Sequence, residues 1–101
     1  GKLGRDAEEI EAYKQSIKIN PEYAGTYYNL GIAYGKGGRW EEAKKALKEA
    51  IKIEPNYAEA HAMRGTACLA TGDRDSALEE YKILKTLDVK SADRLFNLIN
   101  Q

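Results

Sequence analysis

The sequence predicts an all-α protein in which antiparallel helix hairpins repeat along the chain. Three observations support this fold class: an internal repeat of 34 residues, apolar residues at helical spacing within each repeat, and glycine or proline where helices have to end. A length of 101 residues suits one domain and leaves little room for a second. We therefore expect a single repeat domain over residues 1–101.

Internal repetition is the strongest signal in the chain. Shifting the sequence by 34 positions aligns residues 1–24 with residues 35–58, and 13 of these 24 pairs are identical. A second shift by the same length gives a fainter match toward the C-terminus. This decay is expected of a terminal unit that faces solvent on one side. A period of this length is typical of stacked helix–turn–helix units.

Apolar residues within the repeats follow a helical period. Residues 40–53 place alanine, leucine and isoleucine three and four positions apart, with lysines on the opposite side. By this pattern we expect six helices, over residues 6–19, 22–36, 40–53, 56–70, 74–87 and 91–100. Because the connections are two to five residues long, neighbouring helices have to run antiparallel.

The predicted helix ends coincide with residues that break or cap helices. Pro21 and Pro55 disfavour a helical conformation in the residue before them, so each should end a helix. Glycines that could end a helix in the left-handed conformation are Gly4, Gly37, Gly38 and Gly72. Candidate N-caps are Asn20, Asn56 and Ser91.

The repeat resembles the tetratricopeptide repeat (TPR), whose pattern is W-x2-L-G-x2-Y, then A-x3-F, then P. The matching residues are Tyr27, Leu30, Gly31, Tyr34, Ala43, Leu47 and Pro55. The resemblance implies about two and a half repeats in a right-handed superhelix. Its units would be the second half of a truncated repeat (1–21), a full repeat (24–57), a full but diverged repeat (58–91) and a C-terminal capping helix (92–101).

Composition excludes several classes of function. Sixteen basic and sixteen acidic residues give a formal net charge of zero, which argues against nucleic-acid binding. No apolar run approaches the roughly 18 residues of a membrane span, so we expect no membrane insertion. One unpaired cysteine and no signal peptide in this chain favour a cytoplasmic location. We expect no metal and no cofactor, because no Cys/His cluster has ligand spacing.

Catalytic interpretations are weak, and we expect no catalytic residues. His61 stands where the family places a large aromatic residue, which favours a packing role. Cys68 replaces an inward tyrosine and is interpreted as a small buried thiol. The glycine-rich segment 35–38 lacks both the Walker spacing and a preceding strand, so it is interpreted as a turn.

The resemblance implies a concave groove, lined by the first helix of each repeat, that binds a peptide segment of a partner protein. Its positions in this sequence are Tyr28, Asn29, Ile32, Lys36, Glu59, Ala62, Met63, Thr66, Ala70, Phe96 and Asn97. Ile32, Met63 and Phe96 favour an apolar ligand segment. The function predicted is a non-catalytic scaffold for protein–protein interaction.

One subset of the family holds the C-terminal carboxylate of a chaperone with a clamp of Lys, Asn and Arg. Asn29 matches one asparagine of that clamp, but Glu59 and Met63 stand at the places of its Lys and Arg. A free carboxylate would meet another carboxylate there instead of a guanidinium fork. We therefore expect this groove not to use the chaperone clamp.

Two alternatives from other classes remain open. Apolar residues on the first helix (Ile10, Tyr13, Ile17) and the last (Leu95, Leu98) could form a homodimer, since repeat arrays need polar ends to stay monomeric. The chain could also be a regulatory domain of a larger enzyme. It does not begin with methionine, which suggests excision from a longer protein. The partner, the pathway and the organism do not follow from these residues.

Overall fold

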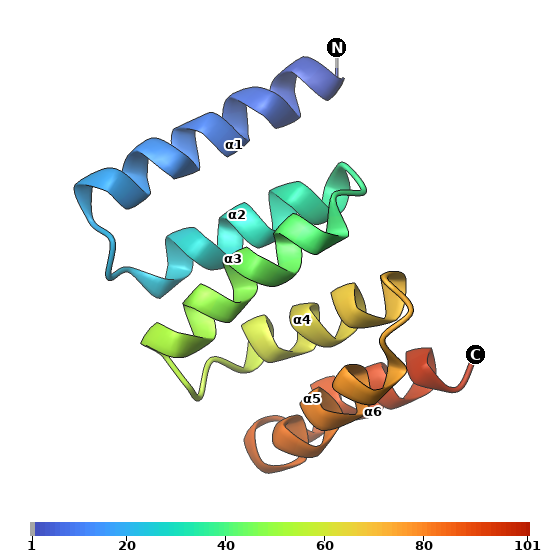
Figure 1. Cartoon of the computed structure of the whole chain (residues 1–101). Coiled ribbons are helices and arrows are strands. Elements are labelled where there is room, and N and C mark those ends of the chain that lie inside the picture. Colours follow the sequence, from blue (N-terminus) through green and yellow to red (C-terminus); the bar gives the residue numbers. More distant parts are fainter. Residues whose placement is uncertain (1) are drawn as a thin grey trace.

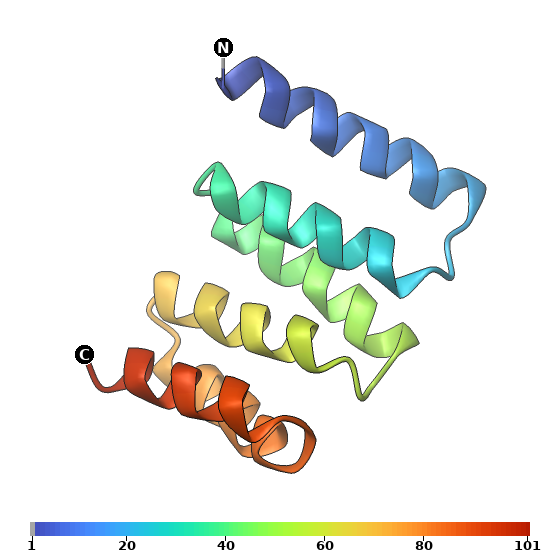
Figure 2. The ribbon, with the colours of Figure 1, turned by 180° about the vertical axis from the view of Figure 1, so that it is seen from behind.

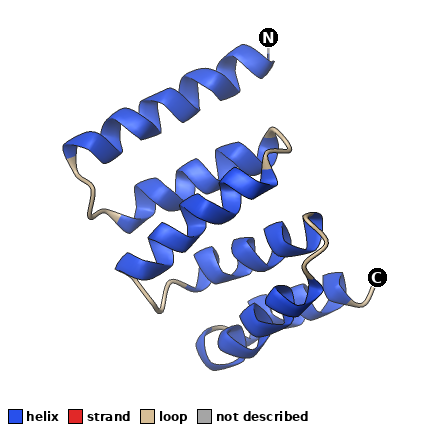
Figure 3. Ribbon diagram, viewed as in Figure 1, coloured by secondary structure: helices blue, strands red, loops and turns tan. Residues whose placement is uncertain are grey.

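In the computed structural model, helices make up almost the whole chain (Figure 1, Figure 3). The structure describes the backbone of residues 2–101 and the side chains of residues 6–101. Its helices are α1 (Lys2–Ile19), α2 (Ala24–Lys36), α3 (Trp40–Ile53), α4 (Ala58–Ala70), α5 (Arg74–Leu87) and α6 (Val89–Ile99). No strand occurs among residues 2–101. The predicted all-α helical-repeat fold is confirmed.

The helices stack as a zigzag in two layers, with the two chain ends at opposite ends of the stack (Figure 1). Helices α3 and α5 lie in front of α2 and α6 in Figure 1 and behind them in Figure 2, which shows the opposite face. Helix α4 contacts both α2 and α6. One layer therefore consists of α2, α4 and α6, and the candidate groove lies on this layer.

Five of the six predicted helices agree with the structure to within two residues at each end, and the exception is the first. Helix α1 begins at Lys2, so the prediction that Gly4 marks a helix end is wrong. Its counterpart one repeat later, Gly38, does form a turn, with a φ of 77°. Glycine permits a left-handed turn without imposing one, and it also tolerates a helix interior at a cost of about 1 kcal/mol.

The predicted N-caps at Asn20 and Asn56 are wrong. Helices α2 and α4 begin three and one residues later than these positions would require, and their N-caps, Tyr23 and Tyr57, accept no side-chain capping bond. The cause is a turn that follows each proline and delays the start of the helix. Asn20 instead accepts a hydrogen bond from the amide of Glu22 at 3.4 Å, within the turn.

Aspartates cap the last two helices. The carboxylate of Asp73 accepts from the amide of Ser76 at 3.1 Å and so caps α5. Asp88 caps α6, because its carboxylate accepts from the amide of Ser91 at 3.4 Å and from the Ser91 hydroxyl at 2.9 Å. Ser91 is thus the residue that donates to the cap, and the prediction that it is the N-cap itself is wrong.

Small residues bring the helices close together. A Cβ added to Gly31 would lie 2.7 Å from Cγ of Leu47 on α3, and one on Gly65 would lie 2.5 Å from a methyl of Leu95 on α6. Both leucines are buried. Gly31 therefore sets the spacing within a hairpin, and Gly65 sets the spacing between α4 and the last helix.

A buried polar network joins α4 to α5. His61 is 3% exposed and Glu80 is 4% exposed. Nε2 of His61 donates to the carbonyl oxygen of Pro55 at 2.6 Å, because a carbonyl can only accept. Its Nδ1 lies 2.5 Å from Oε2 of Glu80, while Oε1 accepts from Nη1 of Arg64 at 2.7 Å. His61 is buried as predicted, but it packs through hydrogen bonds rather than as an aromatic replacement.

Candidate peptide-binding groove

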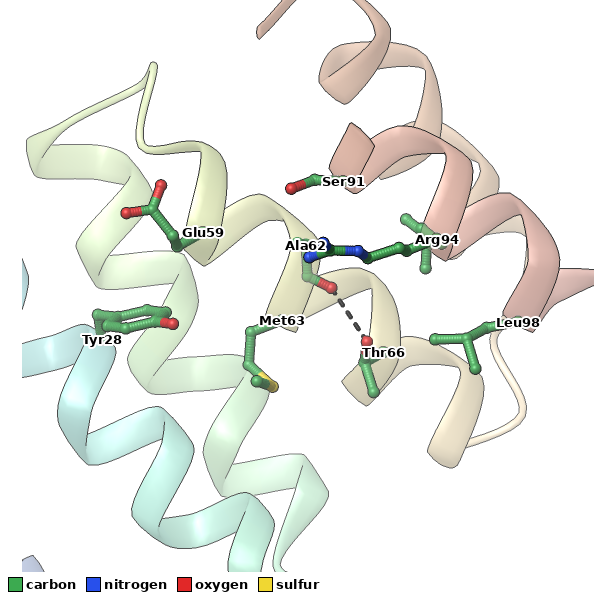
Figure 4. Close-up of a pocket in the computed structure, with 9 residues that line it drawn as sticks. Tyr28, Glu59, Ala62, Met63, Thr66, Ser91, Arg94 and Leu98 are labelled. Atoms are coloured by element: carbon green, nitrogen blue, oxygen red, sulfur yellow. Dashed lines mark hydrogen bonds between the residues drawn. The ribbon is translucent and has the colours of Figure 1, made fainter. Parts of the chain in front are cut away.

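A pocket of about 280 Å³ opens to solvent between α2, α4 and α6 (Figure 4). The residues that line it are Tyr28, Glu59, Ala62, Met63, Thr66, Ser91, Arg94, Leu95 and Leu98. Positions 59, 62, 63 and 66 of α4 and positions 91, 94, 95 and 98 of α6 share one spacing. Residues three and four apart lie on one face of a helix, so each helix presents a single continuous strip.

The pocket includes five of the eleven groove residues that the sequence predicts. These are Tyr28, Glu59, Ala62, Met63 and Thr66. Four others do not line it and lie on the same two helices: Asn29, Ile32, Lys36 and Ala70. Asn29, Lys36 and Ala70 are exposed and Ile32 is half-buried. Their part in ligand binding stays a prediction.

Phe96 and Asn97 complete the predicted groove residues, and their part in ligand binding also stays a prediction. Neither lines the pocket, and the ring of Phe96 packs against Tyr81 of α5 with centroids 5.1 Å apart. Helix α6 buries Ala92, Leu95 and Ile99. This orientation directs positions 91, 94 and 98 toward the pocket, so α6 contributes Ser91, Arg94 and Leu98 to its lining.

The floor of the pocket is apolar. Met63 lies between the α2 and α6 sides of the pocket in Figure 4, and Leu98, which is 41% exposed, faces it from α6. The ring of Tyr28 forms one wall and packs against Tyr57 with centroids 5.2 Å apart. The half-buried Met63 and the exposed Leu98 offer apolar surface that a ligand could remove from water.

Two of the polar groups in the pocket are already hydrogen-bonded. The hydroxyl of Thr66 donates to the carbonyl oxygen of Ala62 at 3.1 Å (Figure 4, dashed line), and the hydroxyl of Ser91 donates to Asp88. In the part of the chain whose side chains are described, Glu59 and Arg94 make neither an ion pair nor a hydrogen bond. The charged groups are therefore the ones free to meet a ligand.

Burial raises the pKa of two tyrosines at the groove and of the buried cysteine. Burial, and then the nearby carboxylate of Glu59, raises the pKa of both Tyr28 and Tyr57 above the ordinary value of 10.0. Both phenols therefore remain protonated near neutral pH and can donate. Burial also raises the pKa of the Cys68 thiol, which is 1% exposed. A protonated, inaccessible thiol is a poor nucleophile.

Metal-ligand clusters and membrane-spanning helices are the two other features considered. Within the described residues, no cluster of three or more His, Cys, Asp or Glu side chains could hold a metal ion. Over the same residues, no helix combines the length and the apolar character needed to cross a membrane.

Comparison with solved structures finds several TPR domains. The second TPR domain of human RPAP3, solved in complex with the HSP70 peptide SGPTIEEVD, has a TM-score of 0.90 and 29% identity over 99% of this chain and 85% of that one. The TPR2B domain of yeast Sti1, in a pHsp70 complex, has a TM-score of 0.90 and 28% identity over 99% and 86%. The second TPR of Spaghetti (RPAP3), bound to the HSP90 peptide SRMEEVD, has a TM-score of 0.80 and 31% identity over 86% and 81%.

Family models agree with the structural matches. A tetratricopeptide repeat model matches residues 24–57, and a second model, described as TPR repeat, matches residues 2–38. Comparison with curated proteins gave no match. The chain belongs to the tetratricopeptide repeat family.

Proposed function

We propose that this chain is a non-catalytic interaction scaffold that binds a peptide segment of a partner protein in the groove of α2, α4 and α6. Residues 24–57 and 58–91 would be its two full repeats. The observation that carries the proposal is the open pocket, whose apolar floor lies beside charged groups that have no partner among the described side chains. Apolar surface with a few convergent polar groups is the usual composition of a binding site.

Related domains support a peptide as the ligand. RPAP3 from human and Spaghetti (RPAP3) were solved with chaperone peptides, at 29% and 31% identity to this chain. Both peptides end in the residues EEVD. The likeness favours the kind of ligand, a peptide, and leaves its sequence to be argued from the residues of this groove.

A non-catalytic role fits the residues that carry reactive groups. The histidine is committed to a buried network with Glu80 and Pro55, and the cysteine is a buried thiol with a raised pKa. The remaining carboxylates and lysines lie on helix surfaces. The Ser91 hydroxyl does bond to a carboxylate, that of Asp88, but this bond belongs to the N-terminal cap of α6.

We further propose that the groove does not clamp a free C-terminal carboxylate. Glu59 lines the pocket at the place of the clamp lysine, and Met63 lines it at the place of the clamp arginine. A terminal carboxylate placed there would be repelled by Glu59 and would find no guanidinium on α4 from position 63.

Selection from a random peptide display library tests the scaffold function. Peptides selected on the wild-type chain should lose binding to Met63→Glu, because the substitution puts a charge on the apolar floor against which a ligand side chain would pack. Ile19→Glu is the matched control, since Ile19 is 86% exposed and lies outside the pocket. Circular dichroism has to show that both variants are folded. Selected peptides that bind both variants as well as wild type would contradict the proposal.

Self-association is a second candidate function, but Ile10 and Leu95, two of the residues on which the sequence bases it, are buried within the chain at 7% and 2% exposure. Other apolar residues near the C-terminal end are exposed instead. Val89 is 64% exposed, Phe96 is 43% exposed and Ile83 is 39% exposed. We propose that such a surface could pair two copies of the chain. Sedimentation velocity over a wide concentration range tests this candidate, and a monomer at every concentration would contradict it.

A further inference from the structure

Two opposite charges lie on different sides of the groove pocket. Glu59 comes from the first turn of α4, on the Tyr28 side, and Arg94 extends from α6 toward Ala62 (Figure 4). The two side chains are more than 4.0 Å apart at their charged atoms, because no ion pair joins them. Both charged groups are therefore solvated when no ligand is bound.

A ligand that fills this pocket has to replace the water around both charges. Glu59 and Arg94 are both exposed at the edge of the pocket, so a bound segment with an opposite charge at each end is attracted there, whereas a like charge is repelled. The guanidinium of Arg94 presents a planar fork that pairs with a carboxylate through two parallel hydrogen bonds. The carboxylate of Glu59 accepts from an ammonium or a guanidinium.

The surface between the two charges favours an apolar ligand side chain. Met63, Leu98 and Ala62 are apolar, and the hydroxyls of Thr66 and Ser91 are already hydrogen-bonded within the chain. A ligand acceptor would find no free hydrogen on these two hydroxyls, whereas an apolar side chain would bury the exposed surface of Leu98. Methionine adapts to side chains of different shape, so the middle position favours apolar character rather than one residue type.

The size of the pocket suits side chains better than a whole small molecule. Its volume of about 280 Å³ lies at the lower edge of the range for small-molecule sites, which is about 300–1,000 Å³. The pocket is open, so a peptide main chain can pass over it while a few side chains enter.

On these grounds we infer that the groove selects an internal segment of a partner protein in which a basic and an acidic side chain flank an apolar one. The basic side chain pairs with Glu59, the apolar side chain packs on Met63 and Leu98, and the acidic side chain pairs with Arg94. The inference rests on the proposed function of the groove, and it adds the charge pattern of the ligand.

Charge-reversal variants test the pattern with one random peptide library. Peptides enriched on the wild-type chain should contain one base and one acid around an apolar residue. Arg94→Glu should enrich peptides in which the acid is replaced by a second base, and Glu59→Lys should enrich peptides with two acids. Lys48→Glu is the control, because it makes the same charge change on an exposed part of α3 outside the pocket. It should enrich the wild-type pattern.

Affinity measurements then give the change in peptide binding caused by each reversed charge. A fluorescent peptide with Lys, Leu and Glu at the enriched spacing, and with both ends blocked, should bind Arg94→Glu about tenfold or more weakly than wild type. The corresponding peptide with a second Lys in place of Glu should show the reverse order. Both effects should shrink at high salt, since partly exposed charges are screened.

Three outcomes separate this inference from the function on which it rests. Enrichment that follows each reversed charge supports both. Peptides that bind with no dependence on either charge, yet lose binding in Met63→Glu, would overturn the charge pattern and leave the groove function standing. A library that yields no peptide sensitive to Met63→Glu would overturn the groove function as well.

Discussion

Removing the carboxylate of Glu80 is expected to destabilise the chain more than any single change on the helix surfaces. Glu80 is 4% exposed and contacts two partners. Its Oε2 lies 2.5 Å from Nδ1 of His61, and its Oε1 accepts from Nη1 of Arg64 at 2.7 Å. Glu80→Ala leaves both partners without this acceptor. Because Arg64 is 28% exposed at its side chain, it can turn to solvent, whereas His61 at 3% cannot.

The magnitude follows from what stays buried. An unsatisfied buried polar group costs about 1–3 kcal/mol. The deleted methylene adds about 0.8 kcal/mol of lost burial. We therefore expect Glu80→Ala to lower the free energy of unfolding by about 2–4 kcal/mol, a large part of the roughly 5–15 kcal/mol typical of a domain. Glu80→Gln keeps the size of the side chain and one oxygen that can accept from Arg64, so it should cost less.

Urea unfolding followed by circular dichroism measures the effect. With a slope of about 1–3 kcal/mol per M, the midpoint of Glu80→Ala should fall by roughly 1–3 M. The matched control is Glu79→Ala, whose side chain is 68% exposed, and its cost should stay within about 0.5 kcal/mol. Equal midpoints for the two variants would refute the assignment of a stabilising role to the buried network.

Further predictions concern packing, capping and ligand choice. Gly31→Ala should destabilise by about 1–3 kcal/mol through the clash with the buried leucine of α3, whereas Gly25→Ala meets only ring atoms of an exposed tyrosine and should cost less; urea midpoints compare them. Hydrogen bonds from the serines three residues later lower the pKa of Asp73 and of Asp88 below the ordinary 3.8. These carboxylates therefore contribute stability above that pH and lose it as pH falls through their folded-state values. An acid titration of the urea midpoint should decline there, and Asp73→Asn should flatten the decline. The peptide SGPTIEEVD should bind weakly, and Glu59→Lys should strengthen it by about tenfold; tight wild-type binding that amidation abolishes would contradict this.

The helices could be predicted from the sequence because their signals are local. The three- and four-residue spacing of apolar residues in 40–53 depends only on that segment, and the helix bounds there agree with the structure. The prolines at 21 and 55 end helices through their own stereochemistry. The first residues of α2 and α4 differ from the prediction. A turn at each proline occupies positions that the N-cap preference of asparagine would place in the helix.

The last helix shows what local pattern leaves open. The structure buries Ala92, Leu95 and Ile99 of α6, whereas the sequence pattern singles out Leu95 and Leu98 and leaves open which flank of the helix faces α4. The contact of Leu95 with Gly65, thirty residues earlier in the chain, sets the rotation and brings Arg94 into the pocket. The family resemblance assumes that the last helix has the same orientation as the first helix of a regular repeat. Phe96 and Asn97 are assigned to the groove on that assumption.

The buried network was also beyond local reasoning. His61 and Glu80 lie 19 positions apart, on different helices, so no spacing within one helix relates them. Repeat position predicted that residue 61 is buried, and burial is what the structure has. The partner that makes a buried histidine acceptable comes from the packing of α5 on α4, which only the assembled fold provides.

Amide NMR titration of the wild-type chain with its best selected peptide shows directly whether the peptide binds in the groove. We expect shift changes to concentrate at residues 59–66 of α4 and 91–98 of α6, around the pocket, and Met63→Glu to remove them. Changes concentrated on α3 and the outer face of α5, with the pocket residues unmoved, would contradict a groove-binding scaffold.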